Sequence, residues 1–239
     1  MRINIDTVIL GDKVILIPYE DIHVEKYHSW MQSQEIQTLT ASEPLTIEAE
    51  YEMQKSWRED DEKLTFIIAD KQMWDDYVFE PNKSSQDATS SNRLTPVGDH
   101  INIDQASQRE IHCIIGDVNL FLNCYPGEKS AEIEIMIAES NARKKGFATE
   151  ALRLMIAYAL HYLNITNFIA KIGCDNIPSI KLFKEKFGFS EISRSEVFKE
   201  ITLGKRIDPE YTSNGKNIEN FHIQKFSNLL FSYKKFRVK

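Results

Sequence analysis

The chain has 239 residues, of which 42% are hydrophobic and 27% charged, and its formal net charge is −7. This composition predicts a globular protein with a substantial core, and the negative charge argues against nonspecific nucleic-acid binding as its main task. Charged residues throughout the first 30 positions leave no room for a signal-peptide core, and no apolar run approaches the roughly 20 residues of a membrane span.

Cysteine and histidine are sparse. The three cysteines form no CxxC pair and the six histidines form no HxxxH pair, which predicts reduced thiols in a cytoplasmic protein without a metal site. The sequence also lacks the glycine-rich loop of nucleotide hydrolases, the GxSxG elbow of serine hydrolases and the GxGxxG fingerprint of dinucleotide-binding enzymes. These three classes of enzyme are therefore not supported.

The N-terminal part alternates strands and helices. The apolar run at 14–18 and the run at 64–69 predict strands. Between them, Asp21 and Thr46 are candidate first residues of helices that end near Met31 and Glu59. Residues from Glu80 to Gln108 are rich in Ser, Asp, Asn and Gln, which predicts an exposed disordered insertion, either a binding loop or a tolerated loop extension.

The second half predicts strands at 114–122, 131–138, 168–172 and 197–203, and helices at 149–163 and 176–187. Gly116 inside the first of these strands signals a bulge or a close approach of backbones. The order of the elements predicts an α/β domain built on a mixed, largely antiparallel twisted sheet flanked by helices.

A basic turn lies between the strand at 131–138 and the following helix. It reads Arg143-Lys144-Lys145-Gly146-Phe147-Ala148. The first N–H groups of a helix have no intrahelical partner and the helix dipole favours negative charge there, while a glycine lets the backbone approach a diphosphate closely. The turn therefore predicts an anion site.

Two motifs in order carry a family resemblance. The basic turn resembles the acetyl-coenzyme A motif of the Gcn5-related N-acetyltransferase (GNAT) superfamily, and the segment from Asn176 to Phe189 resembles its NxxSxxLYxKxGF motif. The segments that begin at Tyr27, Leu39, Gly116 and Glu132 resemble the eukaryotic N-acetyltransferase 9 group, a relative of the bacterial enzymes that acetylate ribosomal-protein N-termini. The resemblance covers residues 1–70 and 111–203.

The resemblance implies a GNAT domain over residues 1–205 that uses acetyl-coenzyme A (acetyl-CoA) as co-substrate. It implies that the glutamate strand parts from its neighbour and that the pantetheine arm pairs with the open edge. The cofactor residues implied in this way are Ile135, Met136, Ile137, Arg143, Lys144, Lys145, Gly146, Phe147, Ala148, Thr149, Asn176, Ser179 and Phe183.

Transfer of an acetyl group to an amine needs a base, because a protonated amine has no lone pair. Glu132 and Glu134 lie on one face of their strand, and Glu132 ranks first because it precedes Arg143 by the offset found in histone-acetylating members of the superfamily. A solvated polar face of an antiparallel strand is the alternative interpretation.

The second motif departs from the family pattern at one position. Phe183 stands where many members have a tyrosine that protonates the leaving thiolate, so that role passes to Ser179, to solvent or to no group. Asn176 has a second interpretation as the N-cap of its helix. Both roles of Asn176 are compatible.

Residues 206–239 form a basic, aromatic extension, interpreted either as a docking segment or as a helix that packs its aromatic residues on the domain. The main functional hypothesis is acetylation of a protein α-amine, with tubulin as a candidate acceptor. Acetylation of a small-molecule amine and a weakly active, microtubule-associated scaffold are the alternatives. The oligomeric state stays open.

Overall fold

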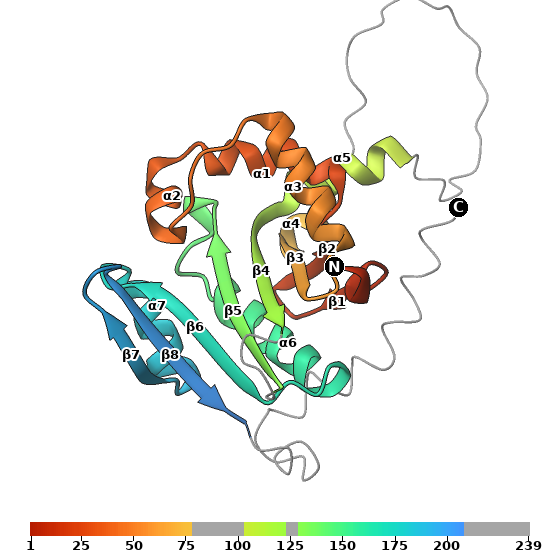
Figure 1. Cartoon of the computed structure of the whole chain (residues 1–239). Coiled ribbons are helices and arrows are strands. Elements are labelled where there is room, and N and C mark those ends of the chain that lie inside the picture. Colours follow the sequence, from red (N-terminus) through yellow and green to blue (C-terminus); the bar gives the residue numbers. More distant parts are fainter. Residues whose placement is uncertain (78–102, 123–128, 208–239) are drawn as a thin grey trace, which may run out of the picture.

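The computed structural model describes residues 1–77, 103–122 and 129–207, with the backbone alone at 103–106. One eight-stranded sheet forms the centre, in the order β1-β2-β3-β4-β5-β6-β8-β7, with helices on both faces (Figure 1). The strands are β1 (Ile9–Leu10), β2 (Val14–Pro18), β3 (Lys63–Asp70), β4 (Ile114–Leu122), β5 (Ser130–Ile137), β6 (Asn167–Gly173), β7 (Ser190–Ser195) and β8 (Glu200–Arg206).

Helices connect these strands and cover the sheet. They are α1 (Val24–Met31), α2 (Gln34–Thr40), α3 (Ile47–Glu59), α4 (Lys71–Asp76), α5 (Ile103–Cys113), α6 (Phe147–Tyr162) and α7 (Ile177–Lys181). Short helical turns are η1 (Arg2–Asn4), η2 (Asp21–His23), η3 (Ser140–Ala142) and η4 (Leu182–Lys186), the last of which is π-helical and continues α7.

Neighbouring strands pair antiparallel throughout, except for β5 and β6, which pair parallel. The connection from β5 to β6 is α6, because parallel neighbours need a crossover. The predicted α/β fold on a mixed, largely antiparallel sheet is thus confirmed.

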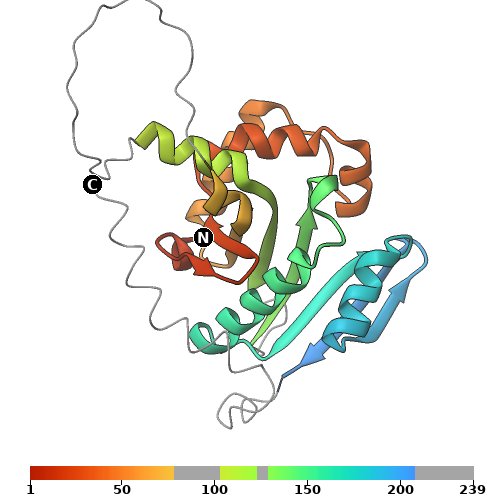
Figure 2. The same ribbon diagram turned by 180° about the vertical axis from the view of Figure 1, so that it is seen from behind.

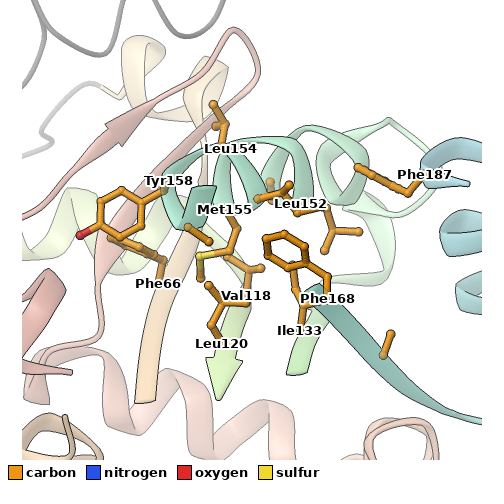
Figure 3. Close-up of a cluster of buried hydrophobic side chains, with 14 of the residues drawn as sticks. Phe66, Val118, Leu120, Ile133, Leu152, Leu154, Met155, Tyr158, Phe168 and Phe187 are labelled. Carbon is orange, nitrogen blue, oxygen red and sulfur yellow. The ribbon is translucent and has the colours of Figure 1, made fainter. Parts of the chain in front are cut away.

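Helix α6 packs on one face of the sheet. Met155 and Leu152 point from the helix towards Val118, Leu120 and Phe168 of the strands, and all five side chains are buried (Figure 3). The ring of Phe66 meets that of Tyr158 edge-on, with 5.8 Å between the centroids. Burial of large apolar side chains here is the main favourable contribution to folding, about 1.5–3 kcal/mol for each.

Helices α1 and α3 cover the opposite face. Tyr19, Tyr27 and Trp30 pack there against Ile15 and Ile67 of the sheet. In Figure 2, which is seen from behind, α6 lies in front of the sheet. Alternate residues of β4 and β5 therefore belong to different cores, which decides where their polar side chains lie.

Gly116 is the site of both features predicted for it. The pairing of β3 with β4 passes from Ile68–Gly116 to Ala69–Ile114, so Ile115 is an extra, bulged residue. A side chain at Gly116 would lie 2.0 Å from the carbonyl oxygen of Met136 on β5. Only a glycine allows the two backbones to approach so closely.

Several boundaries differ from the prediction, and long-range contacts explain them. Residues 103–108 belong to α5, so the predicted insertion ends earlier than Gln108; Arg109 of α5 donates to the Trp74 carbonyl of α4 and thereby fixes the helix. The remainder of the insertion, residues 80–102, lies outside the described residues. Polar composition does not reveal a helix that is held by a tertiary contact.

Some elements were not predicted as they occur. Helix α2 and strand β7 are polar and largely exposed, so neither shows the apolar periodicity that marks an element in the sequence. The last strand runs over Glu200–Arg206 rather than 197–203, because Val197 and Phe198 lie in the turn from β7. The described chain continues to Ile207, whose N–H donates to Thr166, and the predicted extension from 208 onward lies outside the described residues.

Candidate active site

Strands β5 and β6 lie side by side only where they begin. Their parallel pairing covers Ser130 to Glu132, whereas β5 stays paired with β4 as far as Ile137. Beyond Glu132 the two strands part, and Figures 1 and 2 show the gap widening towards α2. Within the described residues, the edge of β5 over 133–137 has no strand beside it on this side. Its backbone groups are available to an added extended segment, and the predicted divergence is confirmed.

The turn before α6 has the backbone of an anion cradle. Gly146 is the N-cap of α6 with φ of +89°, and the first helical bond runs from the Glu150 N–H to the Gly146 carbonyl, 3.1 Å long. No described side chain caps this end of the helix. The N–H groups of Phe147, Ala148 and Thr149 therefore keep their capacity to bind an anion.

Lysines surround this turn. Lys144 and Lys145 are exposed, and Lys144 adopts φ of +63°. Lys13, from the turn between β1 and β2, donates its ammonium to the Lys145 carbonyl over 3.0 Å. A side chain at Gly146 would lie 3.2 Å from the Lys13 Nζ atom. The structure thus adds Lys13, a residue distant in sequence, to the predicted basic turn.

Glu150 in the first turn of α6 fixes where the helix begins. Its carboxylate accepts backbone N–H groups from Asp12, Lys13 and Val14 over 2.6, 2.7 and 3.0 Å. These three bonds join the helix to the β1–β2 turn. The sequence contains no signal of this role, because a glutamate in the first turn of a helix is already explained by the helix dipole.

The Arg143 side chain is bound by groups of the protein itself. Its guanidinium donates to the Ile137 carbonyl over 3.0 Å and pairs with the Glu35 carboxylate of α2 over 2.6 Å. The side chain therefore braces the end of β5 against α2. A contact between Arg143 and a phosphate stays a prediction.

Glu132 and Glu134 face the same side of the sheet as predicted, but their surroundings differ. The Glu132 carboxylate forms an ion pair with Lys171 of β6, 2.6 Å long, at the place where the strands part. Glu134 lies beyond that point and is exposed to water. Surrounding protein nevertheless raises the pKa of the Glu134 carboxyl; the Lys63 ammonium opposes this effect and the charge of Glu132 adds to it. The carboxylate has both properties because neighbouring strands cover one side of it while water reaches the other.

A polar layer lies behind Glu134 on the neighbouring strands. Asn119 of β4 is its cross-strand partner. The Asn119 amide donates to Asp117 over 2.7 Å, and its oxygen accepts the Thr65 hydroxyl over 2.6 Å. Asn119, Asp117 and Thr65 are all buried. Burial raises the pKa of Asp117 to about 7 and the charge of Glu134 adds to the effect, whereas Asn119, Lys63 and Tyr27 oppose it.

Lys63 of β3 completes the layer. Its ammonium lies 3.2 Å from the centre of the Trp57 ring and 3.9 Å from that of Phe121, and the residue is only 4% exposed. Burial lowers the pKa of Lys63 to about 8, against the opposing charges of Glu134 and Asp117. No pattern in the sequence indicated Lys63 or Asp117 as parts of a site.

The second motif shows the N-cap that was predicted as one interpretation of Asn176. The Asn176 side chain accepts the Ser179 N–H over 3.2 Å and so caps α7. Phe183 is 2% exposed and its ring packs 5.0 Å from that of Phe189 in the α6 core. The ring is therefore part of the core, and a contact between Phe183 and the cofactor stays a prediction. The sequence pattern identified its helix but not the direction of this side chain.

Two further features are absent from the part of the chain that the structure describes. No group of three or more His, Cys, Asp or Glu side chains is placed to hold a metal ion. None of the described helices is long and apolar enough to cross a membrane.

The order of these features, strand divergence then glycine turn then helix, has a counterpart among known proteins. A family model described as an acetyltransferase (GNAT) domain matches residues 13–190. The chain belongs to the GNAT acetyltransferase family. This GNAT protein is an acetyl-CoA-dependent N-acetyltransferase.

Relatives of the GNAT chain match most of its length. It is 43% identical to the N-acetyltransferase 9-like protein of Dictyostelium discoideum, with 95% of each chain covered, and 43% identical to the human alpha/beta-tubulin-N-acetyltransferase 9, with 85% of this chain and 84% of that one covered. The fold is similar to that of the ribosomal L7/L12 alpha-N-protein acetyltransferase RimL in complex with coenzyme A, with a TM-score of 0.59 at 11% identity and coverage of 85% and 99%.

Acetyl-CoA suits the geometry of this GNAT site on two counts. The edge of β5 over 133–137 has backbone groups free for an extended segment, and the start of α6 has uncapped N–H groups next to Lys13, Lys144 and Lys145. The site thus offers backbone pairing to one part of the molecule and positive charge to the other.

Proposed function

We propose that this enzyme transfers the acetyl group of acetyl-CoA to a protein N-terminal α-amine, with tubulin as the candidate acceptor. The observation that carries the proposal is the opening between β5 and β6, which has the Gly146 turn at one end and Glu134 on its wall. Human alpha/beta-tubulin-N-acetyltransferase 9, by its name, acts on tubulin, and its 43% identity supports the same acceptor here.

In this proposal the backbone holds most of the cofactor. The groups of Ile135, Met136 and Ile137 on the open edge of β5 pair with the pantetheine arm as a further strand would. The N–H groups of residues 147–149 hold the diphosphate, and Lys144 and Lys145 supply charge.

Glu134 is the proposed base, in preference to Glu132. The Glu132 carboxylate is engaged by Lys171, whereas Glu134 is open to water next to the parting strands and its pKa is raised. A raised pKa brings a carboxylate closer to the working pH and makes it a better proton acceptor. Glu134 takes a proton from the acceptor ammonium, directly or through one water, and the neutral amine attacks the thioester carbonyl.

The leaving thiolate needs little assistance, since a thiol has a pKa of about 8.5 and its anion is a competent leaving group. Asn176 and Ser179, at the start of α7, stay proposed neighbours of the thioester end. The Ser179 hydroxyl is the proposed donor to the thiolate, in the place of the family's tyrosine.

The acceptor enters from the side of α2. Exposed apolar residues occur there on two elements: Leu39 and Leu45 on or after α2, and Val197 and Phe198 in the β7–β8 turn, which lies on the same side of the molecule in both views (Figures 1 and 2). We infer that these side chains contact the first residues of the acceptor peptide. Exposed apolar side chains near an opening are suited to bind an apolar chain end.

Incubation with labelled acetyl-CoA and a library of peptides tests the proposal. The enzyme is expected to label peptide N-termini, with tubulin N-terminal sequences among the preferred ones, and the variant Glu134→Gln to lose this activity. Glu59→Gln, at the exposed end of α3, is the matched control. Labelling of small amines alone would move the acceptor to another class. Binding of acetyl-CoA without transfer to any amine would favour the scaffold.

A further inference from the structure

Helix α2, on the side from which the acceptor enters, has few apolar contacts to hold it in place. All seven of its residues are described, and Ile36 alone is buried. A helix of this length is not stable in water by itself, so its position depends on contacts with the rest of the domain. The same helix carries the exposed Leu39, which is proposed to contact the acceptor.

Helix α1 is the firmly held neighbour of α2. It buries four side chains, among them Trp30 and Met31. The Glu139 carboxylate, which directly follows the last residues of β5, accepts the indole N–H of Trp30 over 2.9 Å and pairs with Lys26 over 2.6 Å. The Gln37 amide of α2 donates to the Met31 carbonyl over 2.7 Å. One connection of α2 therefore leads to α1.

Arg143 provides the second connection, from α2 to the end of β5. Ala138 donates its N–H to Ile115 of β4 over 2.9 Å, so the carbonyl of the preceding Ile137 faces the other way, towards the opening. The Nε atom of Arg143 donates to this carbonyl, and an Nη atom donates to the Glu35 carboxylate of α2. The guanidinium thus lies at the wide end of the opening.

Helix α2 is near both strands that border the opening. The ion pair with Arg143 links it to the end of β5, and Cα atoms of α2 lie within 8 Å of Cα atoms of β6. Figures 1 and 2 show α2 beside the end of β5 in both views. A shift of α2 would therefore change the width of the space through which an acceptor reaches the opening.

The Glu35–Arg143 ion pair is weak as a source of stability but well placed to set a position. Its side chains are 60% and 28% exposed, so water reduces their attraction. A small energy is nevertheless enough to decide where a short helix with one buried side chain lies. The guanidinium has a fixed direction, because its Nε atom is bound to Ile137.

We propose that Glu35 and Arg143 are positioning residues for the acceptor: their ion pair fixes the height of α2, and with it Leu39, above the opening. This role rests on the proposed function, in which the acceptor enters from the side of α2. Glu35 touches none of the reacting atoms and acts through Arg143. Because Arg143 is also the first residue of the basic turn, acceptor affinity is set from the cofactor side of the site.

The main test is Glu35→Gln in the full chain, with steady-state kinetics on an acceptor peptide. We expect the KM for the peptide to rise about threefold to fivefold, while kcat and the Kd for acetyl-CoA stay within about twofold. Glu43→Gln is the matched control, because it removes the same charge from an exposed position just after α2. An equal rise of KM in the control would assign the effect to charge alone and overturn the proposal.

A double variant separates the ion pair from a general weakening of α2, in whose first turn Glu35 also meets the helix dipole. Arg143→Gln by itself should raise the KM for the peptide. Glu35→Gln added to it should raise this KM no further, because Glu35 acts through Arg143. Two effects that multiply in full would contradict the proposal. Tighter binding of acetyl-CoA by Glu35→Gln, with an unchanged KM for the peptide, would mean that Glu35 only competes with the diphosphate for Arg143.

Hydrogen exchange follows α2 without any acceptor and so tests the ion pair independently of the proposed function. The amides of residues 34–40 should exchange at least about threefold faster in Glu35→Gln than in the wild type or in Glu43→Gln. Unchanged exchange would overturn the positioning role whatever the acceptor is. If the wild type acetylates small amines and no peptide, the proposed acceptor is wrong, and the same comparison of KM values with that amine decides the role of Glu35.

Discussion

The ammonium of Lys171 and the carboxylate of Glu132 lie 2.6 Å apart at the last paired position of β5 and β6. The ion pair joins the two strands just before they separate. Two residues farther along, Glu134 has no such partner strand beside it in the described part of the chain and stays open to water. Position relative to the divergence, rather than the residue type, therefore distinguishes the two glutamates.

The first prediction follows from this difference. Glu134→Gln should lower kcat/KM for a peptide acceptor by about 10²–10⁴-fold, the usual contribution of a general base, whereas Glu132→Gln should lower it less than about tenfold. Steady-state kinetics with saturating acetyl-CoA provide the measurement. Equal losses in the two variants would show that the ion-paired glutamate shares the proton transfer.

Gly146 offers a test of the anion cradle. Gly146→Ala places a side chain on a backbone with φ of +89° and next to Lys13, which should cost about 1–2 kcal/mol of stability and raise the Kd for acetyl-CoA. Gly173→Ala is the control, because its added methyl group would meet nothing within 4 Å. Calorimetric titration with acetyl-CoA measures the effect, and equal affinities of the two variants would contradict the placement of the diphosphate.

Glu150 should contribute to both stability and cofactor binding. Glu150→Ala removes the acceptor of three backbone N–H groups of the β1–β2 turn, so unfolding by urea should become easier by about 1–3 kcal/mol. The start of α6 would also lose its anchor, and the KM for acetyl-CoA should rise. Glu59→Ala, at an exposed position, should change neither quantity.

The buried acid Asp117 makes stability depend on pH in a definite direction. Its pKa is raised to about 7 in the folded chain, so between about pH 4 and pH 7 the folded state holds a proton that the unfolded state has released. The contribution of this group to stability is therefore present at low pH and lost as the pH rises through that window. It amounts to a few kcal/mol in total, at about 1.4 kcal/mol for each pH unit.

Asp117→Asn removes this dependence. The variant should gain stability relative to the wild type as the pH is raised from about 5 to about 8, as measured by urea unfolding at each pH. A constant difference between the two proteins over that range would mean that Asp117 is ionised in the folded state at all of these pH values.

Lys63 should tune the base from a distance. Its ammonium lowers the pKa of Glu134, so Lys63→Met should raise that pKa and shift the acidic limb of the kcat/KM profile to higher pH. Methionine keeps most of the side-chain volume between Trp57 and Phe121. Lys55→Met, an exposed position on α3, should leave the profile unchanged. A limb that does not move with Lys63→Met would remove Lys63 from the electrostatics of the site.

Local sequence patterns were sufficient to predict the strand, turn and helix around Gly146. A strand, a turn with Gly146 and an amphipathic helix are each set by neighbouring residues, so their order could be predicted and is confirmed. Gly116 was likewise identified as a bulge or close contact, because a glycine inside a strand usually marks one of these two features. The α/β class followed from the same periodicities.

Side-chain surroundings could not be predicted in this way. Phe183 occupies the family's tyrosine position in sequence, but its ring is packed in a core made by residues distant along the chain. Glu150 looks like an ordinary first-turn acid until the β1–β2 turn is placed beside it. In both cases the contacting residues are distant in sequence, so no local sequence pattern predicts the contact.

The sequence by itself indicated a GNAT acetyltransferase through its resemblance to that family. It also located the glycine turn, because backbone conformation depends on nearby residues. The tertiary structure decided which glutamate is open, through the single short pairing between β5 and β6. It also placed Lys63 and Asp117 behind that glutamate, since the pKa of a carboxyl depends on charges and burial contributed by strands and helices distant in sequence.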